Sequence, residues 1–481
     1  MITGMNLWDA NVWSFVVTLT ILFSAMILAN ILRNTVKFIR HLMIPSSVLG
    51  GFIILFVNFL VKECTGLALF QAATLEMLTY HGLGLGFVAI ALRNPEKQVQ
   101  RKDQPGGFDS GVTVVGGYLL QAVLGLGISL GLYKVLGGFF ASGLLLPMGY
   151  GQGPGQAYNW GNNYENLYGF EHGTSFGLTV AAMGFVAASV GGIIYLNHMR
   201  RKGLLKNELG GDVHDEHLTA EQITGGDEIP LSESMDKFTI QLALVFFAYT
   251  VAYLFMYGIN CIIDTGVLGS FGTNTVQPLI WGFNFLIGTL FALLLKAVLR
   301  GLQKKKIIKR EYCNNFMLNR ISGFMFDIMV VASIAAINLS AFVHVEFIVP
   351  LALLCVVGAV ATYIYLDYLC KHIYKDFRHE AFLSLYGMQT GTASTGIILL
   401  REIDPRFETM AASNLVYHQP WAMVFGFPMM LLMSFAPQSV ANAVITLIVL
   451  IVFFVLMMVI NFRHRIFKKA YARRKKQEVN R

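Results

Sequence analysis

Apolar residues along this chain gather into long runs that are separated by short polar segments. A run of about 20 apolar residues crosses the roughly 30 Å hydrocarbon layer of a bilayer as one helix. Eleven runs meet this criterion, at residues 12–31, 44–61, 72–92, 111–136, 175–198, 238–258, 278–299, 322–342, 347–369, 414–436 and 440–462. The pattern therefore predicts an all-α integral membrane protein.

Two further apolar stretches, 142–161 and 381–400, are interrupted by glycine and proline. The first contains GYGQGPG at 149–155, and the second contains GMQTGTAST at 387–395. In a helix interior, glycine costs about 1 kcal/mol and proline about 3 kcal/mol relative to alanine. Non-helical backbone at membrane depth is tolerated where it is buried in protein. We expect each stretch to form a re-entrant hairpin that turns within the bilayer.

The positions of basic residues give an independent test of this topology. With the N-terminus outside and both stretches as hairpins, the basic clusters and the C-terminal tail lie in the cytoplasm, as the positive-inside rule requires. Segments 135–199, 258–277 and 341–347, which would lie outside, contain no Lys or Arg. Only Lys62 and Lys134 fall outside. If both stretches spanned the membrane, the clusters between Arg200 and Lys309 would face outward instead.

The order of spans and hairpins predicts two inverted-topology repeats of five transmembrane helices, each with one hairpin. The first repeat covers residues 1–200, a cytoplasmic linker covers 201–237, and the second repeat covers 238–437. Residues 438–481 would add one extra helix and a basic cytoplasmic tail. Inverted repeats with interrupted segments at matching positions are typical of secondary transporters, which bind substrate where the repeats meet.

Composition narrows the class of protein further. Hydrophobic residues make up 55% and charged residues 13% of the 481 positions, against about 45–50% and 25% in soluble domains. The net charge of +8 comes from loops and the tail, so it indicates membrane topology and not nucleic-acid binding. The five cysteines form no CxxC pair. We find no nucleotide-binding or hydrolase motif, so we expect no enzyme and no cofactor, with transport driven by an ion gradient.

The glycine-rich loops have the chemistry of a site for an anion and a cation. Glycine lets backbone groups approach a ligand closely, and a half-helix directs unpaired N–H groups and a partial positive charge at a carboxylate. Unwound carbonyls and hydroxyls suit sodium, by analogy with other hard cations. The alternative is that these glycines serve only helix packing. The candidate ligands are Gly151, Gln152, Gly153, Gly155 and Gln156, with Gly387, Gln389, Thr390, Gly391, Thr392, Ser394 and Thr395.

Arg401 follows the second stretch, and its guanidinium could pair with a substrate carboxylate. A cytoplasmic position, or pairing with Glu402 or Asp404, is the alternative.

At these loops the sequence resembles the bacterial sodium/glutamate symporter family, whose hairpins carry GHGTGAAW-like and CGFGLGATPTA-like loops. The matching stretches here are GQGPGQAY at 151–158 and YGMQTGTAST at 386–395, and IPSSVLGG at 44–51 is similar to the family's IPEPVAGG-like helix start. The small-residue run 184–192 also agrees, and the order holds over roughly residues 12–436. The family's His-Gly-Thr is Gln152-Gly153-Pro154 here, its Thr-Pro-Thr is Ala393-Ser394-Thr395, and the last helix lies outside the family pattern.

The resemblance implies a homodimer in the inner membrane, with a mobile transport domain built around the hairpins and a scaffold of the remaining helices. It implies sodium-coupled, elevator-type symport of glutamate or a related small carboxylate or amino-acid anion. Proton-coupled transport or exchange of another organic anion is the alternative that the change from His to Gln152 leaves open. A channel, a membrane receptor and an intramembrane enzyme are the other classes, and neither a continuous polar lining nor a nucleophile with a base points to them.

Overall fold

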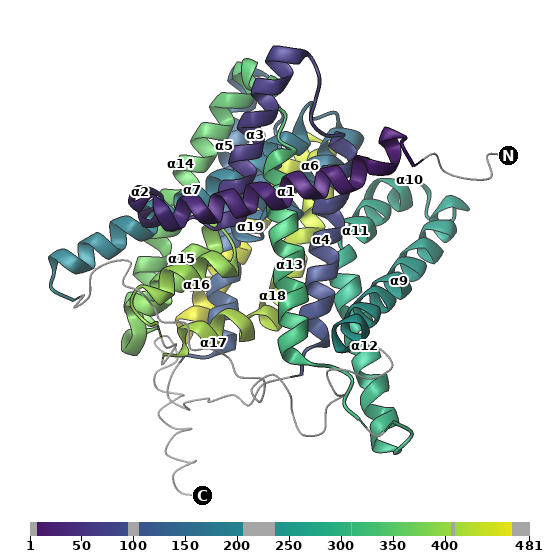
Figure 1. Ribbon diagram of the computed structural model, residues 1–481. Coiled ribbons are helices and arrows are strands. Elements are labelled where there is room, and N and C mark those ends of the chain that lie inside the picture. The colour runs from purple at the N-terminus through teal and green to yellow at the C-terminus, as the bar shows by residue number, and fades with distance from the viewer. Residues whose placement is uncertain (1–6, 95–104, 205–235, 309, 406–408, 464–481) are drawn as a thin grey trace, which may run out of the picture.

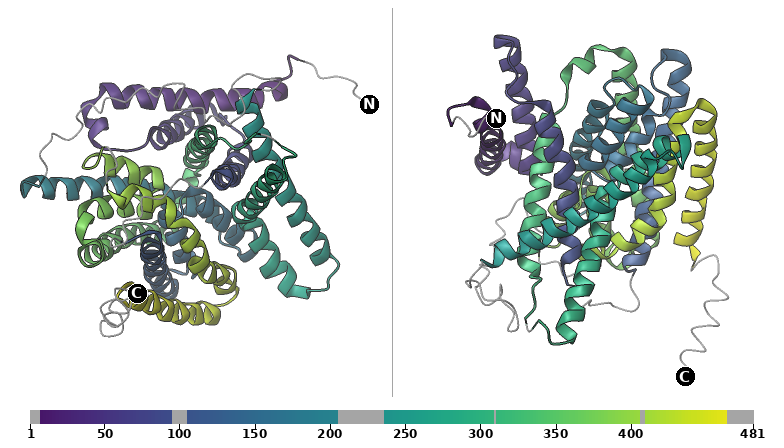
Figure 2. Two further views of the ribbon diagram at one scale, coloured as in Figure 1. Left: turned by 90° about the horizontal axis from the view of Figure 1, so that it is seen from below. Right: turned by 90° about the vertical axis from the view of Figure 1, so that its right-hand side faces the viewer.

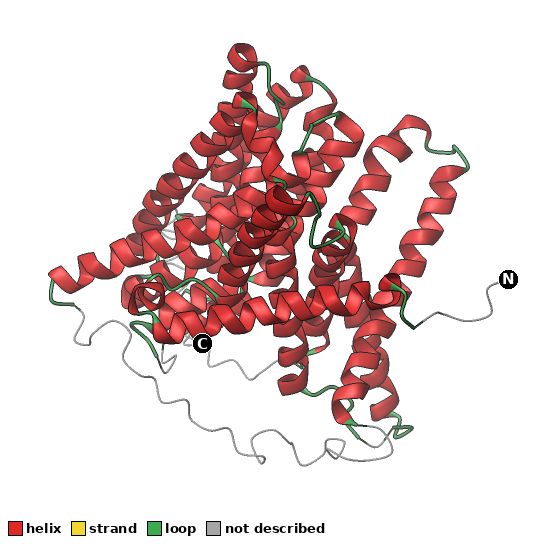
Figure 3. Cartoon of the chain, turned by 45° about the horizontal axis from the view of Figure 1, so that its top comes forward, coloured by secondary structure: helices red, strands yellow, loops and turns green. Residues whose placement is uncertain are grey.

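The computed structural model describes residues 7–94, 105–204, 236–308, 310–405 and 409–463, and among these it contains helices and short connections but no β-strand (Figures 1 and 3). Within these described residues, eleven helices are long and apolar enough to cross a membrane. The prediction of eleven such helices is confirmed, and the chain is a multi-pass membrane protein. The helices are α1 (Ala10–Thr35), α3 (Ser46–Thr65), α4 (Ala72–Leu92), α5 (Gly107–Leu136), α7 (Gly173–Arg201), α9 (Lys237–Asp264), α12 (Asn284–Lys304), α13 (Asn315–Ala335), α14 (Val345–His372), α18 (Gln419–Phe435) and α19 (Val440–Asn461). Most of the predicted linker 201–237, and the basic tail after residue 463, lie outside the described residues.

Several helices begin where a polar side chain satisfies the first free backbone N–H groups. The Asp236 carboxylate accepts hydrogen bonds from the N–H groups of Phe238 (2.9 Å) and Thr239 (3.1 Å) at the start of α9. The Asn314 side chain accepts one from Met317 (2.8 Å) at the start of α13. Such N-caps typically contribute about 1 kcal/mol each, so the sequence itself marks where these helices begin.

Two predicted spans have different boundaries in the structure. The predicted span 278–299 begins later, because the helix is interrupted at Phe283. Residues before it form the short helix α11 (Gln277–Gly282), which follows the α10 (Gly269–Phe271) and η3 (Gly272–Val276) turns. The predicted span 414–436 is divided into α17 (Met410–Tyr417) and α18, with Pro420 in the first turn of α18. Proline has no N–H to donate, so it is favoured in the first turn of a helix, as at Pro420. Helices α14 and α18 nevertheless continue through the interior prolines Pro350 and Pro428.

The helices pack as two units. The frame unit consists of α1, α3, α4, α9, α12 and α13, in which α4 packs against α13 and α12, and α3 packs against α1 and α13. The tip unit consists of α5, α7, α14, α17, α18 and α19 together with the two interrupted segments. In the left view of Figure 2 the frame unit lies along the top and right of the molecule and the tip unit at the lower left.

Glycines allow the central helices of the frame unit to approach closely. Gly82 of α4 lies against Met325 and Met329 of α13, and Gly86 lies against the Phe326 ring. Gly84 contacts the Tyr249 ring of α9. Helix association in membranes depends on this kind of close packing, so α4 forms the centre of the frame unit.

Helix α1 lies at the edge of the molecule in the left view of Figure 2, and in Figure 1 it lies nearly horizontal and crosses in front of the upright helices α13 and α4. It packs chiefly on α3, and the short helix α2 (Lys37–His41) connects the two helices along the chain. Leu22 and Ala25 of α1 join Ile54, Leu75 and Val331 in a small apolar cluster. The rest of its surface is left for lipid or a partner chain.

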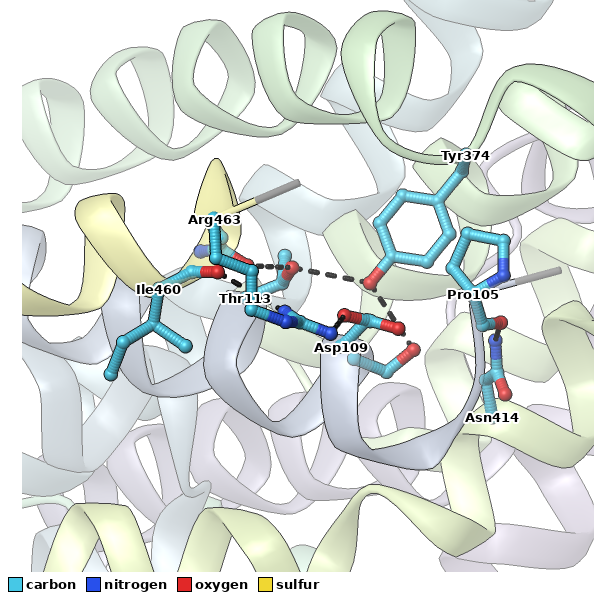
Figure 4. Close-up of polar contacts among 9 residues, drawn as sticks. Pro105, Asp109, Thr113, Tyr374, Asn414, Ile460 and Arg463 are labelled. Atoms are coloured by element: carbon cyan, nitrogen blue, oxygen red, sulfur yellow. Dashed lines mark hydrogen bonds and ion pairs between the residues drawn. The ribbon is translucent and has the colours of Figure 1, made fainter. Parts of the chain in front are cut away.

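The last helix, α19, is fastened to α5 by polar contacts (Figure 4). Arg463 donates to Asp109 at 2.6 Å, and its guanidinium lies 4.8 Å from the centre of the Phe108 ring. Thr113 donates to Asn461 at 3.2 Å, and the Tyr374 hydroxyl donates to Thr113 at 3.1 Å. The α19 helix therefore belongs to the tip unit and not to the frame unit.

Candidate functional site

The first interrupted stretch breaks at Gln152 and Gly153, which we call the first tip. After α5, the chain forms a 3-10 turn η1 (Ser142–Leu144) and a π-helical turn η2 (Pro147–Gly151), which lead to the first tip. Helix α6 (Pro154–Tyr168) follows the tip. Gly153 has φ 86° and ψ −178°, a conformation that is essentially restricted to glycine. The break thus falls inside the predicted stretch 142–161, although α6 continues beyond residue 161.

The second interrupted stretch breaks at Gly391 and Thr392, which we call the second tip. It enters as α15 (Arg378–Thr390), after the η5 turn (Lys375–Phe377), and leaves as α16 (Ala393–Arg401). The two arms touch through glycines, because a Cβ at Gly387 would lie 2.7 Å from the Gly396 Cα. A break was predicted within 381–400 and is found there.

The two tips lie against each other. A Cβ at Gly153 would be 3.5 Å from the Thr392 Cγ2 and 3.8 Å from the Gly391 carbonyl oxygen. Gly184, near the middle of α7, lies against both segments, since a Cβ there would meet the Thr390 carbonyl oxygen and the Tyr150 ring. The structure therefore joins two loops that are more than 200 residues apart in the sequence.

An amide from the middle of α5 lies between the two segments. Gln121 donates through Nε2 to the Gln389 carbonyl oxygen at 3.0 Å and to the Thr362 hydroxyl of α14 at 2.9 Å. The Gln121 Oε1 lies beside Gly151, where a Cβ would be 3.3 Å from it. Since Gln121 lies midway along α5, the tips meet at mid-height of the helix bundle.

Three buried glutamine side chains, two on the interrupted segments and one on α5, have amide atoms with no hydrogen-bond partner within the protein. They are both amide atoms of Gln156, both of Gln389, and the Oε1 of Gln121. Their residues are at most 2% exposed. A buried polar group left unsatisfied costs about 1–3 kcal/mol. Other buried atoms among the described residues, such as Asn414 Oδ1 and Thr446 Oγ1, also lack a partner in the chain, so water or a ligand would serve such atoms equally.

Two helix N-termini begin at the tips without a side-chain cap. The caps of α6 and α16 are Gly153 and Thr392, and neither side chain bonds to its own helix N-terminus. Free N–H groups at a helix start attract an anion. The hydroxyls of Thr392 and Thr395 lie 3.4 Å apart at the start of α16, so donors for an anion and oxygens for a cation occur side by side.

The structure brings together most of the predicted site residues but not all of them. Gly151, Gln152, Gly153, Gln389, Thr390, Gly391, Thr392 and Thr395 gather at or next to the tips. Gly155 instead faces Leu83 and Met329 of the frame unit, and Gly387 packs against the other arm of its own stretch. The Ser394 side chain is exposed.

The structure does not bring Arg401 to the tips. It is the last residue of α16, whose first residue adjoins the second tip, and its side chain is exposed. The nine residues of α16, about 13 Å of helix, separate Arg401 from the second tip. The prediction that its guanidinium holds the substrate is therefore unsupported, and the alternative position outside the site fits the geometry.

Sequence reasoning missed Gln121 and Thr362. The available signal was polarity at the centre of an apolar span, because polar groups inside the membrane are usually functional. Gln121 lies within the predicted span 111–136, and Thr362 lies within 347–369. Their partnership with Gln389 depends on how α5 crosses α14, which the sequence does not reveal.

Comparison with protein-family models and with curated proteins found no match to this chain. Within the described residues, no group of three or more His, Cys, Asp or Glu side chains is placed to hold a metal ion. The oxygens that the structure brings together at the two tips belong to carbonyl and hydroxyl groups. These neutral ligands suit a hard monovalent ion better than a transition metal.

Proposed function

We propose that the protein is a sodium-coupled secondary carrier that moves glutamate or a related small carboxylate or amino-acid anion by alternating access. The observation that carries this proposal is the meeting of two uncapped, glycine-tipped helix starts around buried glutamine amides that lack partners. Broken helices at mid-depth are the form in which secondary transporters bind substrates and coupling ions.

The packing of the two units supports an inverted repeat. In each half, three frame helices precede a helix, an interrupted segment and a final helix of the tip unit. Contacts recur between corresponding helices: α3 packs on α13 as α12 packs on α4, and α1 packs on α3 as α9 packs on α12. The pairs α4 with α13 and α5 with α14 would lie across the repeat axis.

The contact between the two units supports motion of one against the other. It is formed mainly by α6 on α4 and α13, where Gly155 meets Leu83 and Met329. The hydrogen bonds across it include Tyr158 to Glu76 at 3.2 Å and Asn159 to the Gly282 carbonyl at 3.1 Å. A contact with few directional bonds would allow sliding, so in an elevator-type cycle the tip unit would carry the ligands past the frame unit.

Sodium would bind where the carbonyl and hydroxyl oxygens of the second tip converge. The Gly391 carbonyl faces the first tip, and the hydroxyls of Thr392 and Thr395 lie at the start of α16. Binding of the cation would place a positive charge beside the helix starts and so raise the affinity for a carboxylate. Substrate binding should therefore depend on sodium, and by linkage sodium binding should depend on substrate.

Uptake into proteoliposomes with imposed gradients tests the proposal. We expect accumulation of a small carboxylate driven by a sodium gradient and abolished in both Gly153→Leu and Gly391→Leu. Accumulation driven by a proton gradient alone would identify the proton-coupled alternative. Unchanged uptake by both leucine variants would contradict the site assignment.

The natural cysteines test the predicted membrane orientation, in which the N-terminus lies outside and both interrupted stretches form hairpins. Cys64, in the last turn of α3, and Cys261, near the end of α9, are exposed, and both should face outward. An impermeant maleimide should label intact cells through these two thiols, and Cys64→Ser with Cys261→Ser should abolish the label. Cys313 should stay unlabelled, because burial raises the pKa of its thiol to about 11. If labelling appears only after permeabilisation, both thiols face the cytoplasm and the predicted orientation is wrong.

A further inference from the structure

A pocket of the frame unit lies where α4 and α12 end and the chain approaches α13. Its polar lining includes Lys296 and Arg300 of α12, Arg310 and Glu311 of the connection to α13, and Asn94 just after α4. Both α4 and α12 are long and apolar enough to cross a membrane. The pocket between their ends therefore lies at a membrane surface, which the predicted topology places in the cytoplasm.

Hydrogen bonds to the end of α4 hold two of the cationic side chains in place. The Lys296 Nζ donates to the carbonyl oxygens of Ala91 at 2.6 Å and Arg93 at 2.7 Å. The Arg300 Nη2 donates to the Asn94 Oδ1 at 2.8 Å. These acceptors are neutral, so they position the two cations without neutralising their charge.

Carboxylates do not balance the positive charge of this pocket. Among the described residues, neither Lys296 nor Arg300 forms an ion pair with a carboxylate. Glu311 is the acidic side chain in the lining, and it accepts a hydrogen bond from the Asn94 Nδ2. The half-buried Lys296 ammonium is also repelled by Arg300 and Arg93 nearby. Three cations and one carboxylate line the pocket, so its charge is complementary to an anion.

An exposed apolar stripe of α12 runs from this pocket toward the middle of the helix. Going back from Arg300, the residues Ala297, Leu293 and Leu290 follow at spacings of three and four, which places them on one face. All of them are exposed. A dissolved anion would make no use of such a stripe, whereas an acyl chain would lie along it. Charge and stripe together therefore favour a phospholipid.

We propose that the pocket binds the phosphate group of an anionic phospholipid, held by Lys296 and Arg300 of α12 and by Arg310. Guanidinium and ammonium groups are strong partners of phosphate oxygens, and basic pockets between membrane helices bind anionic headgroups. The bound lipid joins the end of α12 to the connection that leads into α13, and so stabilises the frame unit. The site belongs to the frame unit alone and does not depend on the carrier function.

Native mass spectrometry and thermal melting of the purified, delipidated protein test this site. Phosphatidylglycerol is the anionic probe, phosphatidylcholine is the zwitterionic control, and inorganic phosphate shows whether the anion alone is sufficient. We expect phosphatidylglycerol to bind at least about fivefold more tightly than phosphatidylcholine and to raise the melting temperature by mass action. Equal binding of the two lipids, or equal stabilisation by inorganic phosphate at the same concentration, would overturn the lipid site.

Arg300→Gln and Lys304→Gln form a matched pair of variants. Each removes one positive charge, and the two positions lie about one turn apart on α12, but Lys304 is exposed and does not line the pocket. Arg300→Gln should weaken phosphatidylglycerol binding about fivefold while the lipid-free melting temperature stays close to that of the parent. Lys304→Gln should bind as the parent does.

Lys296→Met provides a second variant inside the pocket. It removes the bonds to the end of α4 as well as the charge, so lipid affinity and the lipid-free melting temperature should fall together. Unchanged phosphatidylglycerol binding by Arg300→Gln would contradict the site. Equal losses in Arg300→Gln and Lys304→Gln would also overturn it, because they would indicate a general attraction of the basic surface for anionic lipid.

Discussion

The two interrupted segments share a tip-to-tip contact but differ in what holds them. The first has an irregular entry through 3-10 and π turns, a long exit helix α6, and an outer surface that packs on α4 and α13 of the frame unit. The second has a regular entry helix α15 and a short exit helix α16, and it packs on α7, α14 and α17 inside the tip unit. One segment therefore bridges the two units, and the other is internal to one of them.

This difference teaches which property each segment controls. Changes within the second segment should disturb the folding of the tip unit, since every neighbour belongs to the same packed body. In the proposed carrier, changes on the face of the first segment that packs on the frame unit should alter the transport rate, with a smaller effect on the free energy of unfolding. Matched substitutions in the two segments put this distinction to the test.

The largest effects on stability and transport rate are expected for alanine at Gly396 in the second segment and at Gly155 in the first, because each glycine lies against a close neighbour. At Gly396 a Cβ would collide with the Ser384 carbonyl of the opposite arm, and backbone cannot move aside cheaply, so we expect a loss of about 3 kcal/mol and little folded protein. At Gly155 a Cβ would meet the Leu83 and Met329 side chains at 2.8–2.9 Å. These can shift, so Gly155→Ala should fold and transport roughly tenfold more slowly, a barrier change of about 1.4 kcal/mol.

Thermal melting in detergent and initial uptake rates measure the two consequences separately. A Gly155→Ala protein that melts as early as Gly396→Ala would show that the first segment is as much a part of the folded core as the second. The distinction between bridging and internal segments would then be lost.

The tips themselves should respond unequally to alanine. Gly153→Ala forces a side chain into a φ of 86°, which costs about 1–3 kcal/mol. Gly391 has φ −135°, and its Cβ would lie 3.0 Å from the Thr395 hydroxyl and 3.2 Å from the Phe185 ring, so Gly391→Ala meets crowding without that backbone strain. Denaturation midpoints should rank Gly153→Ala below Gly391→Ala, and the reverse order would argue against a strained first tip.

The smallest effect concerns one hydroxyl in each segment. Tyr158 donates to Glu76 of the frame unit, and Tyr386 donates at 3.2 Å to the Ala187 carbonyl of α7. Either change to phenylalanine removes one hydrogen bond worth about 1 kcal/mol. We expect Tyr386→Phe to lower the free energy of unfolding while the transport rate stays the same. We expect Tyr158→Phe to change the transport rate, by less than about tenfold. Equal changes in rate for both variants would speak against the bridging role of α6.

The sequence predicts features that depend on local chemistry. The long apolar helices follow from runs of apolar residues, and the breaks near Gly153 and Gly391 follow from glycine and proline, which weaken any helix wherever it lies. The same rule favours a helix start at Pro420, but it would also have divided the chain at Pro350 and Pro428, which lie inside α14 and α18. Each of these features is decided by a few neighbouring residues.

Other features depend on which helices cross, and the sequence does not contain that information in readable form. The contact of Gln121 with Gln389 joins residues 268 positions apart. The orientation of Gly155 toward the frame unit and the distance of Arg401 from the tips both depend on the direction and length of α6 and α16. The candidate site was therefore predicted at its loops and missed at the helices that support them.

The attachment of α19 to α5 makes the C-terminal end of this helix a reporter of conformation. In the proposed carrier, a probe on Phe462, next to Arg463, would move with α5, whereas one on α12 would stay with the frame unit. The separation between two such probes would then change and be restored in every transport cycle, which gives a distance measurement of the motion that needs no knowledge of the cargo.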